Sequence, residues 1–132
     1  MDADLMDLYF RPMREELVRA GFRELRTPEE VDAALADDET TRFVVINSMC
    51  GCAGGIARPA AIRAIQHEIR PQELLTVFAS QDREATARLR SYFPDQPPSS
   101  PSMALLKGKR LVHMIHRHQI ENRDPEDLAG EL

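Results

Sequence analysis

Two short runs of apolar residues with strand propensity constrain the fold of this chain more than any other feature. They span Thr41–Asn47 and Glu73–Ala79, and each has the length of a single strand. Their apolar centres suit strands that are buried on both faces of a sheet. The segment between them, Ala57–Ile69, has helical spacing with isoleucines on one face. Two buried strands joined by a helix are expected to pair in parallel through a right-handed crossover.

The remaining elements add helices around these strands and a hairpin beside them. Lys107-Gly108-Lys109 is a tight-turn signal between two strand-like runs. Pro12 is expected either to break the first helical pattern or to start a second helical piece. The expected elements are a helical pattern over 5–18 ended by Gly21, an edge strand over 22–26, helices from Thr27 to about Ala36, over Asp82–Tyr92 and from Asp124 onward, a loop over Pro94–Pro101, and strands over Ser102–Leu106 and Arg110–Ile115.

This order of elements predicts an α/β fold. Strands that alternate with helices form a parallel core, and the closing hairpin adds an antiparallel pair. The simplest arrangement is a mixed central sheet with helices on both faces and an extra helix at the N-terminus. That is the thioredoxin-like layout, and we expect a single domain over residues 1–132.

Charge and hydropathy narrow the range of partners. The formal net charge is −5, which argues against nucleic acid because phosphate binding needs a basic surface. No segment approaches the ~20 consecutive apolar residues of a membrane-spanning helix. The N-terminal segment has neither the basic start nor the apolar run of a signal peptide. We therefore expect a cytoplasmic protein without a membrane partner.

The two cysteines of the chain, Cys50 and Cys52, are separated by one glycine. In a reducing cytosol, paired cysteines are more often catalytic or metal-binding than structural. Cys50 directly follows a buried strand, and the chain then turns into a helix whose unpaired N–H groups and dipole would stabilise a thiolate. We expect Cys50 to be the nucleophile and Cys52 to resolve or modulate it. Gly51 would allow the backbone to take the strained dihedral angles of a bridge between them.

Two other readings of the cysteine pair stay open. Cys50 and Cys52 could hold copper or zinc together with His113, His116 or His118, although the spacing matches no standard zinc pattern. The pair could instead act as a redox switch that changes partner binding without turnover. A further reading, in which the two cysteines fill the core as small apolar side chains, is disfavoured because cysteines that flank a glycine in a strand-to-helix turn fill a core poorly.

The proline-rich loop offers a second part of the site. Ser100 and Pro101 immediately precede an expected strand. In the proposed fold this position holds a cis-proline beside the active cysteine, which leaves the preceding backbone groups free to hold an extended substrate. Our hypothesis is that the Ser100–Pro101 bond is cis and lies against Cys50.

Three segments resemble the bacilliredoxin family. They are N-S-M-C-G-C-A-G-G-I-A-R-P-A over Asn47–Ala60, S-S-P-S-M-A-L-L-K-G-K over Ser99–Lys109, and V-H-M-I-H-R-H-Q-I-E over Val112–Glu121. The resemblance extends over nearly the whole chain. It implies a thioredoxin-like fold and thiol–disulfide exchange, with bacillithiol as the co-substrate thiol and no cofactor. The implied substrates are proteins that carry mixed disulfides with bacillithiol, and weak disulfide-isomerase activity is also implied.

The resemblance also implies roles for individual residues. Cys50 would attack the mixed disulfide and take the bacillithiol, Cys52 would resolve it, and Pro101 would line the substrate groove. Gly51 and Ser100 are further candidate substrate-binding residues. Arg58 is a candidate to bind the carboxylates of bacillithiol, because arginine binds carboxylate in a bidentate manner. The alternative for Arg58 is a helix-surface arginine that pairs with nearby acids.

Overall fold

The computed structural model describes residues 3–66, 70–121, 123–125 and 128–129. Helices and strands alternate along the chain as the sequence predicts. The elements are α1 (Ala3–Arg19), β1 (Arg23–Glu24), α2 (Pro28–Ala34), β2 (Thr41–Asn47), the π-helix η1 (Ala53–Ala57), α3 (Arg58–Ala64), β3 (Glu73–Phe78), α4 (Arg83–Arg90), β4 (Ser102–Lys107), β5 (Arg110–Ile115) and α5 (Arg117–Ile120).

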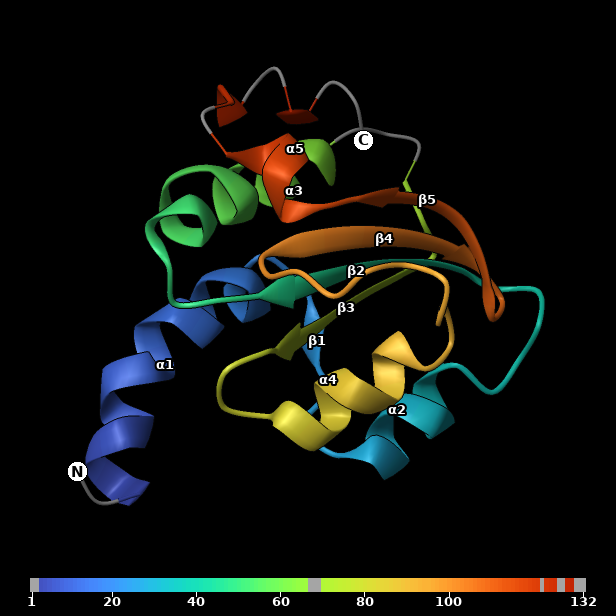
Figure 1. Ribbon diagram of the computed structural model, residues 1–132, viewed down its shortest axis with the longest axis horizontal. Helices are drawn as coiled ribbons and strands as arrows, with labels where there is room; N and C mark the ends of the chain where they lie inside the picture. Colours follow the sequence, from blue (N-terminus) through green and yellow to red (C-terminus); the bar gives the residue numbers. More distant parts are fainter. Residues whose placement is uncertain (1–2, 67–69, 122, 126–127, 130–132) are drawn as a thin grey trace.

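The strands form one mixed sheet in the order β1-β3-β2-β4-β5. β1 and β2 both pair with β3 in parallel, whereas β4 is antiparallel to β2 and to β5. Figure 1 shows α3 and α5 on one side of the sheet and α2 and α4 on the other. The predicted α/β fold, with helices on both faces and an extra N-terminal helix, is confirmed.

The central strand β2 is buried on both faces. Phe43 and Val45 join the core on the side of α3, while Val44 and Ile46 join the core on the side of α2 and α4. Successive side chains of a strand point to opposite faces, so an unbroken apolar run fills both cores. β2 therefore provides a rigid support for the cysteines that follow it.

The N-terminal helix differs from the prediction at Pro12. α1 continues through Pro12 as one helix of 17 residues. Tertiary contacts on either side of the proline hold it: Phe10 is buried against the ring of Phe78, and Arg14 forms a 2.6 Å ion pair with Asp82. These contacts offset the backbone hydrogen bond that a proline inside a helix removes. Among the described helices, none is long and apolar enough to cross a membrane.

Two smaller differences lie near the cysteines and after β5. Helical conformation begins at Gly51, earlier than the expected start at Ala57, and passes through η1 into α3. The short helix α5 was not expected from the sequence. The end of the expected helix over 57–69, including His67, lies outside the described residues. Part of the helix expected from Asp124 onward also lies outside the described residues. Within the described part, the Leu128 N–H donates to the Asp124 carbonyl, as an α-helix requires.

Candidate active site

Strand direction brings three segments together at one edge of the sheet. β2 ends at Asn47, and its neighbour Ile46 pairs with Ser102 at the start of antiparallel β4. Met103 of β4 pairs in turn with Ile115 at the end of β5. The cysteine segment after β2, the Ser99–Pro101 segment before β4 and the residues after β5 therefore all leave the sheet at this edge. This is the edge at which open α/β sheets bind ligands.

Both cysteines are free thiols and partly exposed at this edge. Cys50 lies at the start of the helical segment, and the Ser48 hydroxyl accepts a 3.2 Å hydrogen bond from the Cys50 N–H. Gly51 is helical and fully open, since a Cβ there would meet no atom within 4 Å. The expected strained conformation of Gly51 is therefore not a feature of the reduced protein.

Hydrogen bonds at the helix start stabilise the Cys50 thiolate. Partial burial by itself raises the pKa of the Cys50 thiol. Hydrogen bonds to the sulfur from the Ser48 hydroxyl and from the backbone N–H groups of Ala53 and Cys52 lower it, and the positive charge of Arg117 lowers it further. The lowering contributions prevail, so the pKa of Cys50 is below its ordinary value. A low thiol pKa supplies the attacking thiolate near neutral pH.

A Ser48→Ala variant should make Cys50 less reactive at neutral pH. Ser48 supplies the largest contribution that lowers the pKa of Cys50, so its removal should shift the pKa upward. The rate of Cys50 alkylation by iodoacetamide, measured against pH in a Cys52→Ser background, should rise with pH and reach its midpoint at a higher pH in the variant. Ser91→Ala, on the opposite face of the sheet, is the control. Equal midpoints for Ser48→Ala and the unsubstituted protein would contradict the assignment.

The same shift has a defined effect on stability. The pKa of Cys50 is lower in the folded chain than in the unfolded one, so the ionised thiol favours folding above the unfolded pKa. This contribution is lost as the pH falls through the folded-state pKa.

Arg58 is buried rather than at the helix surface. It is 6% exposed, and its guanidinium donates to the Glu16 carboxylate at 2.8 Å, the Asn47 side-chain oxygen at 2.9 Å and the Ser48 carbonyl at 2.8 Å. A Cβ on Gly54 would lie 2.9 Å from Arg58 Nη2, so the glycine allows this close approach. Hydrogen bonds from Nε and Nη1, one of them to a carboxylate, permit the charge to be buried. The alternative of a surface arginine is wrong because α1 covers the side chain, but the acid that this alternative expected as a partner is present as Glu16.

The proline-rich segment has the expected cis bond between Ser100 and Pro101. The Ser99 hydroxyl accepts a 3.2 Å hydrogen bond from the Arg117 N–H, and the Ser102 hydroxyl donates to the Ser99 carbonyl at 2.9 Å. The Ser100 carbonyl accepts from Arg117 Nη1 at 3.3 Å. This segment is thus held between β4 and the residues after β5.

The histidines make hydrogen-bonding and stacking contacts at this edge of the sheet. His116 lies between Ser99 and Gln96, with Nε2 2.9 Å from the Gln96 oxygen, and its ring stacks on that of His118 at 5.9 Å. Burial, and then the charge of His118, lower the pKa of His116. In the part of the chain that the structure describes, no three His, Cys, Asp or Glu side chains are placed to hold a metal ion. The metal-binding alternative gains no support from these residues.

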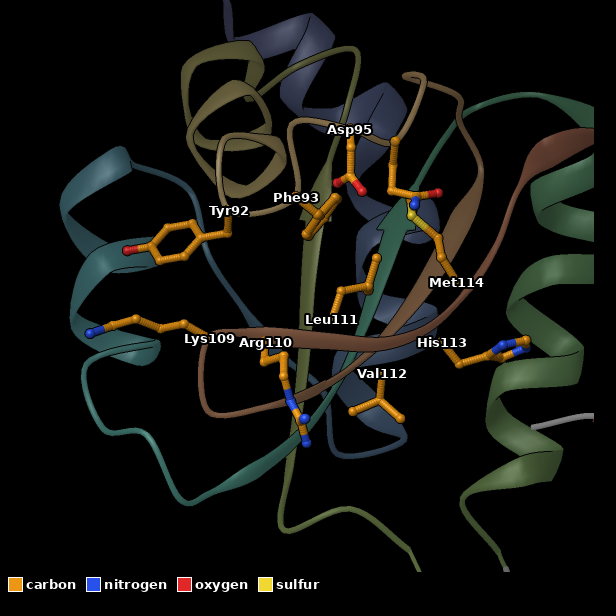
Figure 2. Close-up of a pocket in the computed structure, with 10 residues that line it drawn as sticks. Tyr92, Phe93, Asp95, Lys109, Arg110, Leu111, Val112, His113 and Met114 are labelled. Carbon is orange, nitrogen blue, oxygen red and sulfur yellow. The ribbon is translucent and has the colours of Figure 1, made fainter.

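A cleft elsewhere on the molecule is separate from the cysteines. It has a volume of about 540 Å³ and lies between residues 92–96, after α4, and β5. Figure 2 shows Tyr92 and Phe93 on one side of it and Leu111 and Val112 on the other. Neither cysteine lines this cleft, so the candidate active site is the exposed edge around Cys50.

Two functional residues were missed in the sequence. Ser48 could have been found from its position two residues before Cys50. Arg117 could have been found from strand direction, because β5 runs parallel to β2 across β4 and ends at the same edge. The hydrogen bond to Glu121, and then the negative charge of Cys50, raise the pKa of Arg117. Arg117 thus adds to the site a positive charge that was not predicted from the sequence.

Comparison with known proteins assigns the family. Residues 5–132 match a family model described as disulphide isomerase. A bacilliredoxin of Geobacillus kaustophilus is 59% identical over 130 residues, which cover 98% of this chain and 90% of that protein. A bacilliredoxin of Shouchella clausii is 60% identical over 121 residues, covering 92% of this chain and 83% of that protein.

Solved structures support the fold independently. Mitochondrial thioredoxin 3 from Saccharomyces cerevisiae superposes with a TM-score of 0.57 at 13% identity, covering 83% of this chain and 92% of that one. Fasciola hepatica thioredoxin gives a TM-score of 0.54 at 21% identity, covering 72% and 86%. These similarities establish the thioredoxin fold. The sequence matches show that the chain belongs to the bacilliredoxin family, as the three sequence motifs predicted.

Proposed function

We propose that this protein removes a low-molecular-weight thiol, bacillithiol in the first instance, from mixed disulfides on other proteins. Family membership supports a redox function in general. The observation that carries the specific proposal is the stabilised thiolate of Cys50 at the exposed sheet edge from which the cis-proline segment also leaves.

The first step is an exchange in which no external electron donor takes part. The Cys50 thiolate attacks the sulfur of the small thiol in the mixed disulfide, and a new Cys50 disulfide with that thiol forms as the old S–S bond breaks. The substrate protein leaves as a thiolate and takes up a proton from water. A low pKa of Cys50 favours this attack and also makes Cys50 a good leaving group later.

The second step returns the enzyme to use. The Cys52 thiolate attacks Cys50 Sγ, the small thiol leaves, and a Cys50–Cys52 disulfide forms. Two electrons and two protons then restore both thiols, supplied either by two further low-molecular-weight thiols, which leave as their own disulfide, or by a reductase. Isomerisation of protein disulfides would use the same nucleophile, in agreement with the family description. We assign this activity to the cytoplasm, where thiols are kept reduced.

The test is transfer of the small thiol onto the enzyme, followed by intact-mass measurement. A bacillithiolated and a glutathionylated test protein are each mixed with the reduced wild type, Cys50→Ser and Cys52→Ser. The Cys52→Ser variant should retain the adduct, and the wild type should show either the adduct or the Cys50–Cys52 disulfide. Cys50→Ser should show neither, and the faster donor identifies the preferred thiol. If neither the wild type nor any variant accepts the small thiol, the proposal is contradicted.

A further inference from the structure

We propose that Arg117 selects for small thiols that carry a carboxylate, by binding that carboxylate while the thiol is transferred to Cys50. This inference rests on the proposed function, because it names the chemical class of thiol that the same site accepts. It assigns to Arg117 the role for which the sequence had suggested Arg58.

Position is the first argument for Arg117. It follows β5, whose end lies at the same sheet edge as Cys50. Its guanidinium donates to the carbonyl of Ser100, directly before Pro101, at 3.3 Å. Its charge acts on both Cys50 and Cys52. A small thiol joined to Cys50 Sγ would therefore have its substituents within reach of this cation.

Availability is the second argument. The Arg117 side chain is 45% exposed, and its contacts with Glu121 and Ser100 use two of its five N–H donors. The pair with Glu121 is an exposed ion pair one helical turn apart, and such pairs are weak. A ligand carboxylate can therefore share or replace Glu121 at little cost. The planar guanidinium also matches the geometry of a carboxylate.

The buried arginine of the site does not offer the same chemistry. Arg58 directs its donors to Glu16, Asn47 and the Ser48 carbonyl, all within the chain. A ligand carboxylate would have to break these contacts and enter the interior. Arg117 meets the same chemical need at the surface, where the substrate arrives.

The test measures single transfers from three mixed disulfides whose small thiols carry different charges, and compares each donor with and without the Arg117 guanidinium. One test protein with a single cysteine is blocked with mercaptosuccinate (anionic), 2-mercaptoethanol (neutral) or cysteamine (cationic). Transfer rates to Cys50 are followed by intact mass in a Cys52→Ser background, with and without Arg117→Gln. Loss of Arg117 should slow the anionic donor about fivefold relative to the neutral one, the size expected of an exposed ion pair. The cationic donor should not be slowed beyond the neutral one.

This design separates recognition from other effects of Arg117. A higher pKa of Cys50 or a looser Ser100–Pro101 segment would slow all three donors alike, so the ratio between donors reports recognition only. Arg88→Gln is the matched control: Arg88 has the same 2.7 Å contact from Nε to a carboxylate and similar exposure, but it lies on α4 on the opposite face of the sheet. It should leave all ratios unchanged.

Each outcome decides the inference. A selective loss with the anionic donor, partly restored in Arg117→Lys, supports it. An equal loss with all donors, or no loss with any, overturns it while leaving the exchange activity in place. Failure of every donor to transfer to the Cys52→Ser protein overturns the proposed function, and the inference with it.

Discussion

An Arg58→Ala variant is expected to lose about 3 kcal/mol of unfolding free energy, and roughly 10 °C of thermal midpoint. The substitution removes three hydrogen bonds and takes from the Ser48 carbonyl its Arg58 donor in the interior, whereas the Asn47 side-chain oxygen keeps the Ser48 N–H at 2.8 Å. Buried acceptors that lose their partner carry a desolvation penalty. Arg58→Ala also removes the ion pair with Glu16, which connects the helix after the cysteines to α1. Urea and thermal unfolding followed by circular dichroism measure both changes.

Two further variants test whether the loss of stability in Arg58→Ala comes from the buried contacts of Arg58. Arg63→Ala removes an exposed arginine from the same helix and should change the unfolding free energy by less than about 0.5 kcal/mol. Arg58→Lys keeps the charge but cannot reach all three acceptors, so its stability should fall between the other two. Equal stability of Arg58→Ala and Arg63→Ala would show that the buried contacts contribute nothing measurable.

A Gly108→Ala variant should be destabilised by a similar amount, about 3 kcal/mol. Gly108 has φ +62° in the hairpin turn, and a methyl group there would lie 2.6 Å from the Asp38 Cα and would also strike the Asp38 carbonyl. The glycine also donates to the Thr40 carbonyl at 2.8 Å and accepts from Arg42 Nη1 at 2.8 Å. To relieve the clash, the hairpin turn would have to move away from the segment that contains Asp38 and Thr40. This movement would weaken the hydrogen bond to Arg42, which is 1% exposed.

The controls for Gly108 distinguish the clash from the dihedral angle. Gly108→Asn tolerates the left-handed conformation better than alanine does but still carries a Cβ, so it should also be strongly destabilised. Gly55→Ala adds a methyl group that meets no atom within 4 Å and should change stability by less than about 0.5 kcal/mol. Chemical denaturation of the three variants measures these differences. Full stability of Gly108→Asn would mean that the loop adjusts without cost.

Local chemistry explains most of what the sequence predicted correctly. The run Thr41–Asn47 is a strand with the expected bounds because its apolar side chains can be buried only between two helical layers. The Thr27 hydroxyl accepts from the Glu30 N–H at the start of α2, as its capping pattern predicts. The sequence predicted too late a start for the helix after the cysteines, because Gly54 and Gly55 are poor helix formers. In the structure, the tertiary contacts of Arg58 override this low helix propensity.

By itself, the sequence determined the family, the sheet with helices on both faces, and the place of Cys50 after a buried strand. These features follow from periodicity, turn residues and motifs over short stretches of chain. Only the tertiary structure decided that α1 passes through Pro12, that Arg58 is buried and that Arg117 lies at the same edge of the sheet as the cysteines. Each depends on groups far apart in the chain, such as Glu16 with Arg58, or the ends of β2 and β5. Such contacts arise from packing and strand direction, which no local pattern encodes.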